Sequence, residues 1–101
     1  MDGDDSARAV ALRQWTEGRS GDIGVSLDLS GPFEHAGQDP EFVLRLEGPR
    51  RLGEVLLFRG GLVMLHSFVK EDPAPEMEIL HLADVTPEQL TAALDELGSK
   101  L

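Results

Sequence analysis

Residues 51–70 have the sequence RLGEVLLFRGGLVMLHSFVK, in which two apolar runs are joined by a short stretch holding two glycines. Leu52 to Phe58 and Leu62 to Val69 each have the length and the apolar content of a strand. Glycine readily adopts the positive φ angles that tight hairpin turns need, so Arg59-Gly60-Gly61 predicts a hairpin between the two runs. The second run is apolar on both faces, which predicts a central strand.

Three more strands are predicted around this hairpin. Ile23 to Leu29 alternates apolar residues with small or polar ones, which is typical of a strand with one solvated face. The stretch 30–40 is rich in glycine and proline and predicts a loop, after which Glu41 to Glu47 alternates again. Residues 71–75 hold two prolines and break the chain, and Glu76 to Leu82 is the fifth predicted strand.

The first of two amphipathic helices is predicted over Ala7 to Glu17, with Gly18 as its end. Three polar residues before it can accept hydrogen bonds from the free N–H groups of the first turn. These candidate N-cap residues are Asp4, Asp5 and Ser6. The apolar stripe of this helix would consist of Val10, Ala11, Leu12 and Trp15.

The second helix has the clearest start signal in the chain. Thr86 is the predicted N-cap, Pro87 occupies the first helical position, and Gln89 is spaced to complete a capping box. Apolar residues then recur at helical spacing from Leu90 onward, and Gly98 is the predicted end.

The order α-β-β-β-β-β-α predicts an α+β fold. Consecutive strands with short connections form an antiparallel meander of about five strands, and the N- and C-terminal helices pack on one face of it. The length of 101 residues fits a single domain over residues 1–101. Within it, residues 1–5 are expected to be flexible and residues 30–40 to form a loop.

The composition excludes several classes of function. With 19 acidic and 9 basic residues the net charge is −10, which repels nucleic-acid phosphates and anionic membranes. The chain has no cysteine, an acidic start unlike a signal peptide, and no apolar run of membrane-spanning length, so we expect a cytoplasmic protein. A partner protein with a basic surface suits this charge; solubility alone is the alternative explanation.

No catalytic constellation is recognisable, so the sequence predicts a protein that is not an enzyme and needs no cofactor. There is no glycine-rich phosphate loop and no nucleophile elbow. If the last two strands are joined by a loop at 72–75, His66 faces His81 with the Cβ atoms about 5 Å apart. Such a pair could begin a metal site, given a third ligand; packed or hydrogen-bonded histidines are the alternative, and no metal site is assigned.

Two groups of residues are candidates for binding a partner. Acidic residues accumulate between positions 70 and 90, where Lys70 is the only lysine or arginine, although solvated charge is an alternative explanation. This acidic group consists of Glu71, Asp72, Glu76, Glu78, Asp84 and Glu88. Apolar anchors would come from residues that point away from the helices, depending on the strand register, unless a homodimer covers that face. These candidates are Leu56, Phe58, Val63, Leu65 and Val69.

The chain resembles the TriTu immunity proteins of bacterial polymorphic-toxin systems. The features that carry this resemblance are Arg13-Gln14-Trp15 in the opening helix, the alternating strand at 24–28, the glycine–aromatic–glycine hairpin at 51–61, and the closing helix Thr86 to Leu97. The similarity covers most of the chain but rests on pattern and order. Phe58 departs from the family, which commonly has tryptophan at this position.

The resemblance implies an antidote that binds and neutralises a cognate toxin. The toxins of that family look like ADP-ribosyltransferases that use NAD and act on elongation factor Tu. An immunity protein could block either the NAD cleft or the surface that docks the target. The alternative is a small acidic secretion or assembly chaperone acting as a dimer, whereas an immunity protein would be a monomer or a weak homodimer when free.

Overall fold

The computed structural model describes residues 2–19, 25–33, 40–71, 73–74 and 76–101. Within these ranges, five antiparallel strands form one sheet in chain order, preceded by one helix and followed by another, which confirms the predicted α+β order. The helices are α1 (Asp2–Arg19) and α2 (Pro87–Lys100). The strands are β1 (Ser26–Ser30), β2 (Phe42–Glu47), β3 (Arg51–Leu57), β4 (Val63–Val69) and β5 (Glu78–Leu82).

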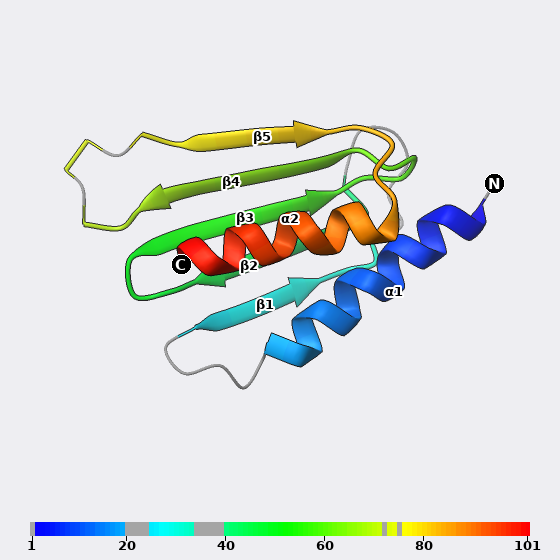
Figure 1. Ribbon diagram of the computed structural model, residues 1–101, viewed down its shortest axis with the longest axis horizontal. Coiled ribbons are helices and arrows are strands. Elements are labelled where there is room, and N and C mark those ends of the chain that lie inside the picture. The colour runs from blue at the N-terminus through cyan, green and yellow to red at the C-terminus, as the bar shows by residue number, and fades with distance from the viewer. Residues whose placement is uncertain (1, 20–24, 34–39, 72, 75) are drawn as a thin grey trace.

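Both helices lie on the same face of the sheet (Figure 1). Helix α2 runs across the middle strands, and α1 packs against α2 and β1. The core between these two layers is made almost entirely of aliphatic side chains with one tryptophan and one phenylalanine. It consists of Leu12, Trp15, Phe42, Leu44, Leu46, Val55, Leu57, Val63, Leu65, Val85, Leu90, Leu94 and Leu97. Among the described residues, no helix has both the length and the apolar character needed to cross a membrane.

The strand register decides which apolar residues enter this core. Leu57 pairs with Val63 and Val55 with Leu65, and all four side chains are buried under the helices. Val63, Leu65 and Val69 were candidates for the outward face, and that expectation is wrong, because all three alternate to the helix side of β4, where Val69 remains exposed. Leu56 does alternate to the opposite face, because successive side chains of a strand point to opposite sides.

Strand β4 is internal, since it pairs with β3 on one side and β5 on the other. The middle strand of the sheet is β3, however, so the prediction that β4 is the central strand is only partly correct. Strands β2 to β4 have the predicted bounds to within one residue, whereas β5 begins at Glu78 and not at Glu76. The first predicted strand overlaps β1, but positions 23 and 24 lie outside the described residues.

Helix α1 is longer than predicted at both ends. It begins at Asp2, so the three candidate N-cap residues lie inside its first turns, and it continues through Gly18 to Arg19. Its buried stripe is also different, because Leu12 and Trp15 are joined by Arg8 and not by Val10. Val10 is 49% exposed, since positions 8, 12 and 15 share one side of a helix and position 10 does not.

The predicted start of α2 is confirmed. The Thr86 hydroxyl accepts a hydrogen bond from the Gln89 N–H at 3.1 Å, and the Thr86 N–H donates to Gln89 Oε1 at 2.9 Å, which completes the capping box. The predicted end is wrong, because the helix continues through Gly98 to Lys100. A Cβ at Gly98 would lie 3.2 Å from Cζ2 of Trp15. The glycine therefore allows α1 and α2 to approach closely and does not terminate α2.

Arg8 connects three parts of the chain that are distant in sequence. Its Nε donates to the carbonyl oxygen of Val85 at 2.6 Å, and one terminal nitrogen pairs with Asp5 at 2.9 Å. The same Asp5 oxygen accepts from the N–H of Gly60 in the β3–β4 hairpin at 2.9 Å. Nothing in the sequence distinguished Arg8 from the other arginines, because its partners are brought to it only by folding.

Candidate functional site

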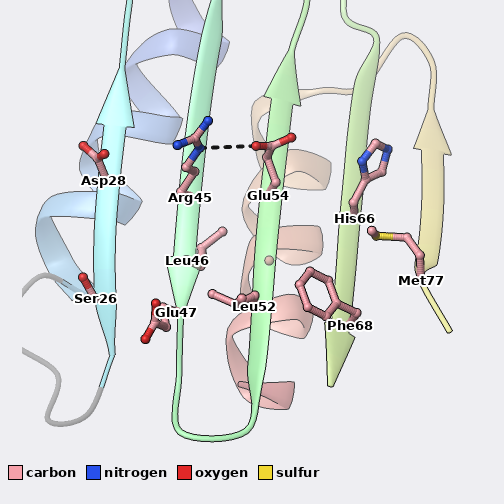
Figure 2. Close-up of a pocket in the computed structure, with 11 residues that line it drawn as sticks. Ser26, Asp28, Arg45, Leu46, Glu47, Leu52, Glu54, His66, Phe68 and Met77 are labelled. Atoms are coloured by element: carbon pink, nitrogen blue, oxygen red, sulfur yellow. Dashed lines mark ion pairs between the residues drawn. The ribbon is translucent and has the colours of Figure 1, made fainter. Parts of the chain in front are cut away.

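The face of the sheet opposite the helices is the candidate site, and we call it the open face. In Figure 2 the helices lie behind the strands, and the labelled side chains belong to the uncovered side, except that of Leu46, which is part of the core. Its residues come from alternate positions of all five strands, together with Met77 just before β5. They are Ser26, Asp28, Ser30, Val43, Arg45, Glu47, Leu52, Glu54, Leu56, Met64, His66, Phe68, Met77, Ile79 and His81.

The register arranges the open face in rows that run across the strands. The middle row is charged, because Asp28 pairs with Arg45 and Arg45 with Glu54, and the row continues to His66 (Figure 2). Arg45 Nε lies 3.4 Å from Glu54 Oε2. A charged row of alternating sign therefore crosses the centre of the sheet.

Apolar side chains lie on both sides of the charged row. On one side, Leu52 pairs with Phe68, and a hollow of about 480 Å³ lies between these side chains, Met77 and the charged row. On the other side, Leu56 pairs with Met64. All of these apolar side chains are half-buried or exposed, because no described segment lies over them. This mixture of apolar and charged rows is suited to contact with another protein surface.

Comparisons with protein-family models, curated proteins and solved structures found no match for this chain. The resemblance to the TriTu family therefore rests on the sequence features alone. What the site does has to be argued from its own geometry.

The two histidines expected to face each other are diagonal neighbours. His66 pairs with Ile79, and His81 pairs with Met64, so the predicted register is wrong by two residues. The ring centroids of His66 and His81 are still 6.2 Å apart. Because a slip of two residues keeps every side chain on its own face, alternation could not distinguish the two registers.

His66 has an unusual environment for a polar side chain. Its Nε2 atom is buried and has no hydrogen-bond partner among the residues that the structure describes. Within the same residues, no group of three or more histidines, aspartates and glutamates is placed to hold a metal ion. In this part of the chain His66 and His81 therefore gain no third ligand.

The predicted acidic group is divided by the fold. Glu71 and Glu76 are exposed in the β4–β5 connection, whereas Asp84 and Glu88 are exposed beyond the opposite end of β5 (Figure 1). Asp72 lies outside the described residues. These carboxylates therefore flank the two ends of β5 and do not gather in one patch.

Glu78 differs from the other acidic candidates because it already has basic neighbours. Its Oε2 atom lies 3.4 Å from Arg51 and 3.7 Å from Lys100, on the helix side of the sheet. Lys70 is therefore not the only base near the acidic group, and instead it pairs with Glu47 at 3.0 Å. Folding brings Arg51 and Lys100 to Glu78 from distant positions.

The two apolar candidates in the predicted site lie close together along the chain. Leu56 is half-buried on the open face, within β3. Phe58 follows β3 directly, is half-buried, and donates its N–H to the carbonyl oxygen of Leu62 at 2.9 Å. Leu56 is thus part of the apolar row with Met64, and Phe58 stands at the start of the hairpin.

The most exposed apolar residues of the sheet are not among the residues predicted to bind a partner. Met77, Ile79 and Leu80 are 50%, 58% and 48% exposed, and all three belong to β5 or precede it directly. A signal for them was present, because the last strand of a five-stranded meander is an edge and has no neighbour on one side. The pattern Met77-Glu78-Ile79-Leu80 also places apolar residues on both faces.

Proposed function

We propose that this chain is an immunity protein that acts in the cytoplasm by binding a cognate bacterial toxin through the open face and so neutralising it. The observation that carries the proposal is the pair of apolar rows on a sheet face that no described segment covers. Partly exposed apolar side chains bordered by polar and charged ones are typical of protein interaction sites. No bond is made or broken in this function.

The overall charge supports a partner with a basic surface. With a net charge of −10, the chain attracts a positively charged surface over several ångströms, which speeds the encounter and orients the two proteins. The TriTu resemblance suggests a toxin that uses NAD, and a site that binds the anionic pyrophosphate of NAD presents positive potential. An acidic protein is complementary to such a site, so we propose that the toxin is an NAD-dependent ADP-ribosyltransferase.

The test uses the product of the adjacent gene, expressed as a catalytically inactive variant. The double variant Leu52→Ser, Phe68→Ser removes one apolar pair from the open face. Since buried anchors carry most of the affinity of an interface, we expect binding to weaken by at least about tenfold and protection of cells to fall. Val10→Ser is the control, because Val10 is an exposed apolar residue that belongs to α1 and lies outside the open face.

Two results would contradict the proposal in different ways. Full binding and protection by the Leu52→Ser, Phe68→Ser variant would exclude the open face as the contact. Failure of the unmodified chain to bind the adjacent gene product or to protect cells from it would exclude the immunity function.

A secretion or assembly chaperone remains the second candidate, favoured by the exposed apolar residues of β5. A chaperone holds an extended client segment, and such segments commonly add to a sheet edge. Gel filtration separates the two functions: a stable dimer of the free chain favours the chaperone, and a monomer that forms a one-to-one complex with a folded toxin favours the immunity protein.

A further inference from the structure

The outer edge of β5 has backbone groups that no described segment pairs. The N–H of Phe58 donates to the carbonyl oxygen of Leu62, and the N–H of Lys70 donates to that of Arg50. The even-numbered residues of β4 therefore direct their backbone N–H and C=O groups toward β3. The odd-numbered residues of β4 therefore bond to β5, where their partners are Glu78, Leu80 and Leu82. Ile79 and His81, which alternate with them, direct their N–H and C=O groups outward.

Strand β5 has apolar side chains that are only partly covered on both faces of the sheet. Ile79 is 58% exposed on the open face, and Leu80 is 48% exposed on the helix side. Beside Leu80, a groove of about 280 Å³ lies between β5 and α2, and its lining combines apolar Leu65, Ala93 and Leu97 with charged Glu78, Glu96 and Lys100. One additional strand along β5 would cover Ile79 and Leu80 at the same time.

The opposite edge of the sheet is different. Strand β1 carries Asp28 at its centre, with serines at both ends of the strand. A charge in the middle of an edge strand is a common protection against pairing with other chains. Strand β5 carries its one charged side chain, Glu78, at its first residue, so the middle of the β5 edge lacks this protection.

The charges at the ends of β5 argue against a second copy of this chain as the added strand. In a two-fold antiparallel pairing centred on Leu80, Glu76 of each copy would come near Asp84 of the other, because the two residues lie just beyond opposite ends of β5. Like charges brought close together repel, and each copy also carries a net charge of −10. A strand with basic residues at its ends would instead meet Glu76 at one end and Asp84 at the other.

From these observations we infer that the β5 edge binds an extended segment of a partner protein, which adds as a sixth strand. The segment is apolar at its centre and basic at both ends. This inference rests on the proposed function in one respect only, namely that the segment would belong to the toxin. The contact would then join the open face and the edge into one continuous surface through Ile79.

The experiment uses a fluorescently labelled synthetic peptide with alternating valine and threonine at its centre and two lysines at each end. Binding to the full chain is followed by fluorescence polarisation. Ile79→Pro removes an outward N–H but leaves the bonds to β4 intact, since proline is tolerated at such edge positions. We expect affinity to fall at least about tenfold. Ile79→Ala keeps the N–H and should lose less of the affinity for the peptide.

A charge exchange provides a second variant that leaves the backbone unchanged. Glu76→Lys combined with Asp84→Asn, since asparagine tolerates the φ of 52° at position 84, should weaken binding of the lysine-flanked peptide and strengthen binding of the same peptide flanked by glutamates. Circular dichroism checks that each variant is folded. The inference is overturned if the lysine-flanked peptide does not bind the unmodified chain, if Ile79→Pro binds it equally well, or if the free chain forms a dimer through this edge.

The two proposals fail separately. Peptide binding without toxin binding would exclude the immunity function but keep the β5 edge as a strand-binding site. Toxin binding that is unchanged in Ile79→Pro would keep the immunity function and exclude the edge from the contact. The Leu52→Ser, Phe68→Ser variant should still bind the peptide, because its substitutions lie on β3 and β4.

Discussion

At the scale of single residues, Arg8 makes the most consequential polar contacts in the molecule. Its guanidinium is buried and has a carbonyl partner on Val85 and a carboxylate partner on Asp5. A Cβ at Gly61 would lie 2.7 Å from a terminal nitrogen of Arg8, and the φ angle of Gly61 is 93°. Glycine at position 61 is therefore required both by the turn and by the close approach of Arg8.

Replacing Arg8 should destabilise the fold through the groups that it leaves behind. Arg8→Met removes the partner of the Val85 carbonyl and the cation beside Asp5, so we expect the free energy of unfolding to fall by about 2–3 kcal/mol. Urea denaturation measures this loss. Arg13→Met is the matched control on the same helix: the exposed Arg13 lies over the Phe42 ring at 5.2 Å, and its loss should cost about 1 kcal/mol or less. Equal losses in the two variants would contradict the role given to Arg8.

Replacing His66, unlike replacing Arg8, should stabilise the fold. Since its Nε2 atom is buried without a partner, His66→Leu should raise the free energy of unfolding by about 1 kcal/mol. His81→Leu is the control, because His81 is exposed and should change stability little. Urea denaturation of both variants at neutral pH gives the comparison. A clear loss of stability in His66→Leu would mean that Nε2 is satisfied in solution.

At the scale of secondary-structure elements, two helical glycines make a matched pair. No described atom lies within 4 Å of a Cβ built on Gly18, whereas a Cβ on Gly98 would lie 3.2 Å from Trp15. Trp15 has little freedom to move, since its Nε1 donates to Asp95 at 2.8 Å and the Arg19 guanidinium lies 5.4 Å from its ring centroid. A Cβ therefore has free space at position 18 but a close contact with a fixed ring at position 98.

The same substitution should consequently have different effects at the two sites. Gly18→Ala should raise the free energy of unfolding by about 0.5–1 kcal/mol, because alanine favours the helix. Gly98→Ala gains the same helix propensity but forces the α1–α2 contact apart, so it should gain less or lose stability. Thermal unfolding by circular dichroism compares the two variants. A larger gain at Gly98 than at Gly18 would contradict this packing.

The element scale also shows what sequence patterns can and cannot predict. Period-two alternation located β1 and β2, apolar runs located β3 and β4, glycine located the hairpin at Gly60 and Gly61, and the capping box located the start of α2. The pairing of β4 with β5 was missed by two residues, because both registers bury the same side chains. Gly98 was taken for a helix end, because a glycine that ends a helix and one that admits a neighbouring ring are identical in the sequence.

At the scale of the whole molecule, the net charge governs the response to salt. Most of the ion pairs among the described residues have at least one exposed partner, for example Arg45 with Glu54, and such pairs contribute little to stability. Repulsion within a chain of net charge −10 is then the larger effect. Salt screens this repulsion and should stabilise the free protein.

Raising sodium chloride from about 50 to about 300 mM should therefore raise the midpoint of thermal unfolding by a few degrees. The rate of association with a basic partner should fall over the same range, because attraction between the two proteins is screened as well. Calorimetry and stopped-flow measurements give the two quantities, and potassium chloride serves as the control salt. A fall in the unfolding midpoint would show that the ion pairs outweigh the repulsion.

The sequence by itself determined the fold class, the order of the elements and the sign of the surface charge. These properties follow from local periodicity, capping residues and composition, which act over a few residues or over the sum of all of them. Only the tertiary structure decided that the acidic group is divided between the two ends of β5 and that Glu78 meets Arg51 and Lys100. These features depend on register and on contacts between distant segments, and no local pattern encodes them.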